Sequence, residues 1–158
     1  MFNIGDKVVY PMHGAGVIES IEEREISGET LSYYVIKLPM GEMRAMVPLN
    51  KVEEVGLRQV IQESEIRSVL DVLKSDSSLM PLNWNHRYRA NMEKIKSGSI
   101  YEVAEVVRNL SLRDRQKGLS TGEKKMYENA RRILISELVL AKDIAENQAV
   151  EILESYLN

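Results

Sequence analysis

The chain has 158 residues, of which 44% are hydrophobic and 28% charged, so it can form one domain or two small ones with a packed core. It contains no cysteine, which excludes disulfides, thiolate chemistry and cysteine-ligated zinc. No apolar run approaches the ~20 residues that span a bilayer, and the first residues lack the basic and apolar segments of a signal peptide. We therefore expect a cytoplasmic protein that does not enter a membrane.

Charge is distributed unevenly along the chain. The net charge is −3, but residues 81–132 carry 12 Lys/Arg against 6 Asp/Glu, a net +6. Residues 1–56 and 133–158 each carry −4. Because the local field determines what a surface attracts, the basic block favours a polyanionic partner and the acidic N-terminal part a different one. The alternative is that the basic block is a solvated helical face.

Residues 1–56 have the pattern of a small β domain. Strands are expected at 7–10, 17–26, 31–38 and 43–47, separated by turns at 12–16, 27–29 and 39–41 that contain glycine or proline. The pair Gly14 and Gly16 is assigned to a tight turn. About fifty residues are few for an independent core, so a closed barrel without exposed strand edges is the expected arrangement.

From about residue 57 the hydrophobic period becomes helical, as in a compact bundle. Successive apolar stripes comprise Ile66, Val69, Leu70 and Leu73; Tyr88, Met92 and Ile95; Ile100, Val103, Ala104 and Val107; and Met126, Ala130, Ile133, Leu134, Leu138 and Ala141. Residues 75–78 interrupt the first helix, and a last helix is expected at 146–157. Ser99 with Glu102, and Ser120 with Glu123, are predicted capping boxes. The expected fold class is α+β: a barrel over 1–56, then a bundle over 57–158.

The segment 83–89 (NWNHRYR) contains the only tryptophan and opens the basic block. If Asn83 caps a helix, Trp84 lies in its first turn with Arg87 on the same face, while His86 and Arg89 point outward. A helix N-terminus favours phosphate, and Lys124 and Lys125 follow another predicted N-terminus. Rings can wedge between or stack on bases while cations bind phosphates. The alternative is that Trp84 is a core anchor at a helix start.

Catalysis and metal binding have little support in the sequence. The two histidines, His13 and His86, lie in different halves, whereas metal sites need clustered ligands. The Gly14 and Gly16 pair lacks the Gly-Lys-Ser/Thr end of a phosphate loop and precedes a strand. We expect no enzyme, no cofactor and no metal. There is no helix-turn-helix or zinc-finger signature, which argues against sequence-specific base readout.

Four motifs resemble the CarD/CdnL family of bacterial transcription regulators, and together they extend over the whole chain. They are residues 5–16 (GDKVVYPMHGAG), 83–91 (NWNHRYRAN), 103–110 (VAEVVRNL) and 118–124 (GLSTGEK). The first motif is also similar to the polymerase-interacting module of transcription-repair coupling factors. This chain has no helicase motifs and is too short for a translocase.

The resemblance implies a Tudor-like (SH3-like) barrel that binds the β subunit of RNA polymerase and a helical domain that touches promoter DNA. In this family the tryptophan, here Trp84, wedges into the minor groove at the upstream edge of the transcription bubble and prolongs the open complex. The polymerase sets the position, so DNA contact is independent of sequence. The implied protein acts as a monomer associated with the nucleoid.

The resemblance also assigns contact residues. Arg24 matches a polymerase-contacting arginine, whereas Met46 stands where the family has a basic residue, and Arg44 on the same strand face is its replacement. Arg87, Arg89 and Lys124 match DNA-side cations, and His86 stands where some relatives have arginine. The remaining alternative is a protein–protein adaptor of the transcription machinery without direct DNA contact, in which Trp84 is buried.

Overall fold

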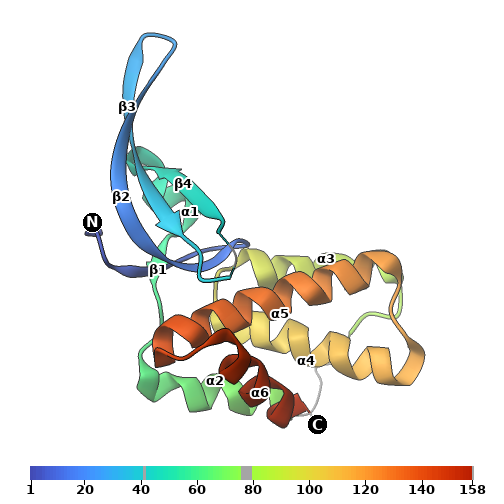
Figure 1. Ribbon diagram of the computed structural model, residues 1–158. Coiled ribbons are helices and arrows are strands. Elements are labelled where there is room, and N and C mark those ends of the chain that lie inside the picture. Colours follow the sequence, from blue (N-terminus) through green and yellow to red (C-terminus); the bar gives the residue numbers. More distant parts are fainter. Residues whose placement is uncertain (41, 76–79, 158) are drawn as a thin grey trace.

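The computed structural model describes residues 1–40, 42–75 and 80–157, which form a β-sheet docked on a helical bundle (Figure 1). The strands are β1 (Lys7–Tyr10), β2 (Gly14–Ile26), β3 (Glu29–Lys37), β4 (Arg44–Pro48) and β5 (Arg58–Gln59). They form one antiparallel sheet in the order β4-β3-β2-β1-β5. The predicted α+β class, with β preceding α, is confirmed.

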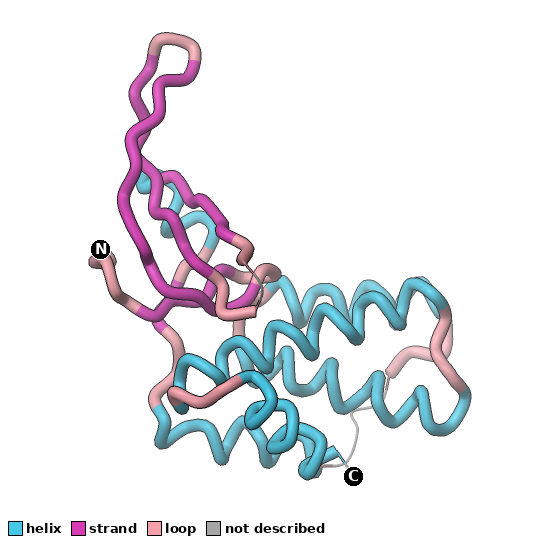
Figure 2. Tube along the Cα trace, in the orientation of Figure 1, coloured by secondary structure: helices cyan, strands magenta, loops and turns pink. Residues whose placement is uncertain are grey.

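The long strand β2 organises the sheet. Its first residues pair with β1 and the remainder pairs with β3, with a register shift between Ile18 and Ser20. The hairpin turn after β2 has positive φ at Ser27 (54°) and Gly28 (83°), as a type I′ turn requires. This hairpin projects away from the rest of the molecule (Figure 2). Within the described residues the ladder runs from β4 to β5 without joining its ends, so the Tudor-like domain is partly open and the expected closure without exposed strand edges is wrong.

The predicted turn at 12–16 is wrong in its second half. The turn ends at His13, and Gly14 and Gly16 already belong to β2. A Cβ on Gly14, which has a φ of +107°, would lie 2.9 Å from Ser136 Oγ, and one on Gly16 would lie 2.5 Å from the Ile36 side chain. Close packing on both faces, together with positive φ at Gly14, therefore explains these glycines better than a tight turn does.

The helices are α1 (Val52–Val55), α2 (Ile66–Lys74), α3 (Trp84–Lys96), α4 (Ile100–Lys117), α5 (Thr121–Lys142) and α6 (Glu146–Leu157). Short 3₁₀ turns, η1 (Leu49–Lys51) and η2 (Glu63–Glu65), precede α1 and α2. The predicted stripes form one core, with Tyr88, Met92 and Ala141 partly buried at its margin. The predicted interruption at 75–78 lies largely outside the described residues. None of the described helices is long and apolar enough to cross a membrane.

The predicted helix caps differ in outcome. Asn83 accepts a hydrogen bond from the His86 backbone N–H, and Ser120 accepts one from the Glu123 backbone N–H, so both caps are confirmed. Ser99 is the N-cap of α4, but its side chain makes no capping hydrogen bond. A capping box includes a hydrogen bond from a backbone N–H of the first helical turn to the serine hydroxyl. That half of the predicted box at Ser99 is therefore wrong.

The sheet is fastened to α5 by side-chain contacts that cross between the two halves. Arg58 donates two hydrogen bonds of 2.8 Å to the carboxylate of Glu137, which is completely buried and also accepts from the Ile61 backbone N–H. The Ala15 backbone N–H donates to Ser136 Oγ at 2.9 Å. Because β5 carries Arg58 and pairs with β1, the sheet extends beyond residue 56, where the sequence suggests that it ends.

Candidate nucleic-acid interface and polymerase-facing surface

Trp84 begins α3 at the surface of the helical half. Its relative exposure is 42%, so the hypothesis that it is a core anchor is wrong. Leu82, two residues earlier, is 90% exposed. A half-exposed indole beside an exposed aliphatic side chain is unusual for a solvated surface, where large apolar groups normally occur singly.

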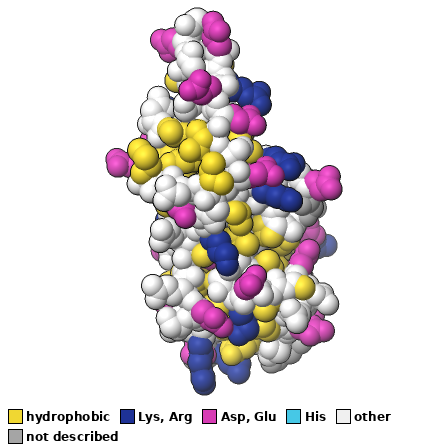
Figure 3. Space-filling model, turned by 60° about the vertical axis from the view of Figure 1, so that its left-hand side comes forward, with side chains coloured by type: hydrophobic (Ala, Val, Ile, Leu, Met, Phe, Trp, Pro, Cys, Tyr) yellow, Lys and Arg dark blue, Asp and Glu magenta, His cyan; other side chains and the backbone are white. Residues whose placement is uncertain are grey.

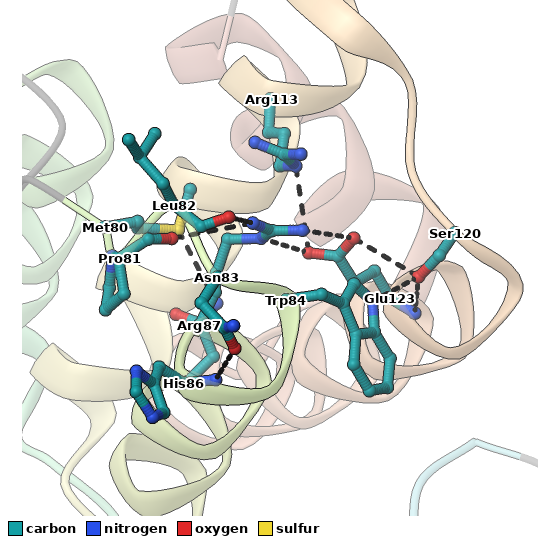
Figure 4. A network of polar contacts seen from close by, with 11 residues as sticks. Met80, Pro81, Leu82, Asn83, Trp84, His86, Arg87, Arg113, Ser120 and Glu123 are labelled. Carbon is teal, nitrogen blue, oxygen red and sulfur yellow. Dashed lines mark hydrogen bonds and ion pairs between the residues drawn. The ribbon is translucent and has the colours of Figure 1, made fainter.

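The indole is nevertheless held on two sides. Its Nε1–H donates a 2.9 Å hydrogen bond to Ser120 Oγ, the N-cap of α5. Its ring stacks on Tyr88, one turn along α3, with ring centroids 5.1 Å apart and an interplanar angle of 22°. The N-termini of α3 and α5 therefore meet at this side chain (Figure 4). Both termini direct free backbone N–H groups and the positive ends of helix dipoles toward this region.

Arg87 does not lie on the surface as predicted. It is 3% exposed, and its guanidinium donates to both carboxylate oxygens of Glu123, at 2.8 and 3.2 Å (Figure 4). It also donates to the backbone carbonyl of Leu82. The cause is visible in the helical period: Arg87 shares the buried i, i+4 row of Asn91 and Ile95. In this conformation the side chain braces the site and is not available to a phosphate.

Glu123 is the anion at the centre of this network. Burial acts to raise its pKa, but the hydrogen bonds and positive charge of Arg87, together with Ser120, outweigh burial and leave the pKa below its ordinary value. Arg113 Nε lies 3.9 Å from the same carboxylate. Two arginines thus flank one carboxylate, and the excess charge is positive beneath the indole. The sequence indicated Glu123 only as a helix-capping residue, and it gave no signal for Tyr88 as a stacking partner.

The remaining predicted DNA-side residues are at the surface. His86, Arg89, Lys124 and Lys125 are all exposed. His86 and Arg89 belong to α3, whereas Lys124 and Lys125 lie in the first turns of α5 after the Ser120 cap. The Trp84–Ser120 hydrogen bond brings these two helix ends together, so side chains predicted from separate segments belong to adjoining helix ends.

The predicted polymerase-side residues Arg24, Arg44 and Met46 share one face of the sheet. Their strand partners are Leu31, Lys37 and Val35, respectively. Paired residues in an antiparallel ladder point to the same face, as do alternate residues along β3. The opposite face carries the sheet's own core, which includes Ile18, Tyr34, Ile36 and Val47. The three predicted residues therefore lie on the face that the sheet core leaves free.

Arg24 and Arg44 are nevertheless far apart on that face. Arg44 lies level with Val17 through Lys37, whereas Arg24 is seven residues further along β2, a separation of roughly 20 Å. Arg24 pairs with Glu22 at 3.2 Å, and Arg44 donates two hydrogen bonds to Glu19. Acidic side chains surround the tip of the projecting hairpin, and apolar side chains gather below it (Figure 3). A partner that contacts both Arg24 and Arg44 must therefore cover an extended surface.

Within the described ranges, no group of three His, Asp or Glu side chains is arranged to hold a metal ion. The candidate sites are a sheet face with separated arginines and an exposed tryptophan where two helix N-termini meet.

Comparison with known families assigns both halves to a class of transcription protein. Residues 2–61 match the model described as the CarD-like/TRCF RID domain, and residues 68–154 match the C-terminal domain of CarD. This combination defines a transcription regulator whose N-terminal domain interacts with RNA polymerase. The chain belongs to the CarD family, and the predicted family resemblance is confirmed.

A relative that is similar over most of the chain agrees with this assignment. The chain is 44% identical over 148 residues to the "Putative transcription factor YdeB" of Bacillus subtilis (strain 168), with 94% of this chain and 97% of that protein covered. The 72-residue N-terminal domain of Myxococcus xanthus CarD, solved by NMR in solution, is 30% identical with a TM-score of 0.33. That match covers 37% of this chain and 79% of that one.

Proposed function

We propose that this regulator binds the β subunit of RNA polymerase through its sheet and stabilises the open promoter complex through its helical domain. Trp84 inserts into the minor groove at the upstream edge of the transcription bubble, and DNA contact is independent of base sequence. The protein acts as a monomer in the cytoplasm, on the nucleoid. The observation that carries the proposal is a 42% exposed indole where two helix N-termini meet, and the first two turns of these helices also carry the exposed residues His86, Arg89, Lys124 and Lys125.

The physical basis is a difference in affinity between two states of DNA. Inserting an apolar wedge requires unstacking that amounts to a few kcal/mol per base step. DNA at a bubble edge has already lost part of that stacking, so the wedge binds the opened state better and shifts the equilibrium toward it. His86, Arg89, Lys124 and Lys125 contact backbone phosphates, and each neutralised phosphate steepens the salt dependence by about 0.9. Arg87 makes none of these contacts, because its buried guanidinium is paired with Glu123.

The sheet supplies the position on the promoter. A few phosphate contacts give weak DNA binding, and tethering to polymerase raises the effective concentration of the helical domain at the bubble. Arg24, Arg44 and Met46 are the proposed polymerase contacts, on the sheet face opposite the sheet core. Because Arg58, Glu137 and Ser136 fasten the sheet to α5, a polymerase bound to one half determines where Trp84 lies.

The first test replaces Trp84 with alanine and measures the lifetime of open complexes formed by polymerase on a linear promoter with a competitor. We expect a shorter lifetime and unchanged binding to polymerase. Leu82→Ala is the matched control, because it removes a more exposed apolar side chain from the segment just before α3 and should leave the lifetime near that of the native protein. A Trp84→Ala protein that remains folded and prolongs the open complex normally would refute the wedge and favour the adaptor without DNA contact.

The second test concerns the sheet. Arg24→Glu is expected to weaken capture of the isolated polymerase β subunit, because it reverses an exposed charge on the proposed contact face. Lys51→Glu reverses an equally exposed charge in η1 and should have little effect. Equal capture by the native protein and Arg24→Glu would remove Arg24 from the contact.

A further inference from the structure

The Trp84 indole is held by one side-chain hydrogen bond and one stacked ring. Ser120 Oγ lies 2.9 Å from the indole Nε1, and the opposite constraint is the stacked ring of Tyr88. The first turn of α5 also passes close by, since a Cβ on Gly122 would lie 3.5 Å from the Trp84 ring and 3.7 Å from the Tyr88 ring. The indole therefore has close neighbours on three sides although 42% of the residue is exposed.

The hydrogen-bonding capacity of Ser120 is fully used. A serine hydroxyl has one donor and two acceptor sites. Here Oγ accepts from Trp84 Nε1–H and from the Glu123 backbone N–H, and it donates to Glu123 Oε1 at 3.2 Å. An indole can only donate, so Ser120 must present a lone pair to it. Because the hydroxyl donates its hydrogen bond to the carboxylate of Glu123, a lone pair of Oγ is left to accept from Trp84.

Glu123 is itself held by a side chain of α3, the helix that carries Trp84. Its carboxylate receives two hydrogen bonds from Arg87, which lies three residues after Trp84 in α3. The contacts therefore form a closed loop from Trp84 to Ser120 and Glu123 on α5, and back through Arg87 to α3 (Figure 4). Arg87 and Glu123 are 3% and 2% exposed, so water does not compete strongly for these bonds.

We propose that Ser120 is a positioning residue that holds the Trp84 indole in its DNA-competent orientation, with Glu123 and Arg87 holding Ser120. This inference rests on the proposed function of Trp84. A ring that is ordered before it meets DNA loses less freedom on insertion, which corresponds to roughly 2- to 10-fold in affinity for one side chain. The indole N–H is already satisfied within the protein, so the ring offers DNA its apolar surface and no base-reading donor.

The first experiment measures the indole itself in the free, full-length protein. Trp84 is the only tryptophan, so time-resolved fluorescence anisotropy and acrylamide quenching report on this side chain alone. Ser120→Ala should increase the fast motion of the ring and its quenching. Ser120→Thr, which retains the hydroxyl, should behave like the native protein. Ser99→Ala is the matched control, because it changes another helix N-cap whose side chain makes no capping hydrogen bond.

The second experiment measures open-complex lifetime with the same variants and polymerase. Ser120→Ala should shorten the lifetime about 2- to 10-fold without weakening polymerase binding, and it should have no further effect in a Trp84→Ala background. Ser120→Thr keeps the hydroxyl and should give an open-complex lifetime like that of the native protein. Ser99→Ala should be neutral.

The outcomes separate the two proposals. Unchanged anisotropy and quenching in Ser120→Ala would overturn the positioning role, whatever the DNA result. A mobile ring combined with a native lifetime, in conditions where Trp84→Ala shortens it, would also overturn that role. A mobile ring combined with no effect of Trp84→Ala on lifetime would refute the proposed function, while the hydroxyl would still be shown to hold the indole.

Discussion

Two arginine–glutamate pairs of similar geometry have different places in this molecule. Arg87 and Glu123 join α3 to α5 inside the bundle, and both are almost fully buried. Arg58 and Glu137 join the sheet to α5, with Glu137 fully buried and Arg58 30% exposed. Each arginine donates two hydrogen bonds to its carboxylate. The first pair is linked to Trp84 through the hydroxyl of Ser120. The second pair fastens the polymerase-interacting half to the helical half.

The comparison shows similar chemistry at two different junctions. The Arg87 pair lies next to the side chain that hydrogen-bonds Trp84, and the Arg58 pair lies between the sheet and α5. Buried ion pairs are weak evidence for stability, because desolvation offsets much of their attraction. They are nevertheless sensitive to removal of one partner, since the other is left as a buried charge. Single substitutions should therefore separate the two roles.

The largest effect is expected for Arg87→Met, which leaves the Glu123 carboxylate buried without its main partner. The free energy of unfolding should fall by about 3–5 kcal/mol, toward the lower end because Arg113 remains nearby. Urea denaturation followed by far-ultraviolet circular dichroism measures this change. Arg131→Met provides the control, since Arg131 contacts a Glu154 that is 57% exposed, and it should lose no more than about 1 kcal/mol.

A double substitution sharpens that result. Arg87→Met with Glu123→Leu removes both charges and should restore much of the lost stability. It should not restore open-complex lifetime, because Ser120 then lacks the acceptor that orients its hydroxyl. Recovery of both stability and lifetime would show that the ion pair serves only packing.

A smaller effect is expected for Glu137→Gln, which keeps the size of the side chain but removes the charge that Arg58 contacts. The free energy of unfolding should fall by about 1.5–3 kcal/mol, the range for hydrogen bonds to charged groups. Hydrogen exchange should become faster in β1, β5 and the adjoining face of α5, while the Trp84 fluorescence remains native. Glu154→Gln is the matched control, and exchange at the sheet should be unchanged in it. Protection across the sheet–α5 contact that survives Glu137→Gln would assign the docking to Ser136 and Gly14 instead.

The same comparison explains what sequence patterns could predict. The strands, the helical stripes and the caps at Asn83 and Ser120 follow from local periodicity and capping chemistry, so they could be predicted. Arg58 with Glu137 and Arg87 with Glu123 are 79 and 36 residues apart, and no local pattern links them. The family resemblance identified Arg87 as a DNA-side cation, but its place in a row with Asn91 and Ile95 turned it inward. The environment of Trp84 likewise depends on a distant residue, because its indole contacts Ser120 at the start of α5.

The smallest and most selective effect is expected from acidification. The folded-state pKa of Glu123 is lowered, so its contribution to stability is fully present above its unfolded pKa and is lost as pH falls through the folded value. Glu123→Gln lacks this contribution, and the gap in unfolding free energy between it and the native protein should therefore narrow below about pH 4.5. Urea denaturation from about pH 7 to pH 3 measures the gap.

Glu19 provides the comparison for that acid effect. Its hydrogen bond from Arg44 also lowers its pKa, so Glu19→Gln should narrow the gap in the same direction. Both Glu19 and Arg44 are at the surface, where salt screens the pair, and added salt should therefore reduce the Glu19 effect much more than the Glu123 effect. Equal salt sensitivity at the two sites would contradict the assignment of Glu123 to a sheltered network beneath Trp84. Unequal sensitivity would support that assignment.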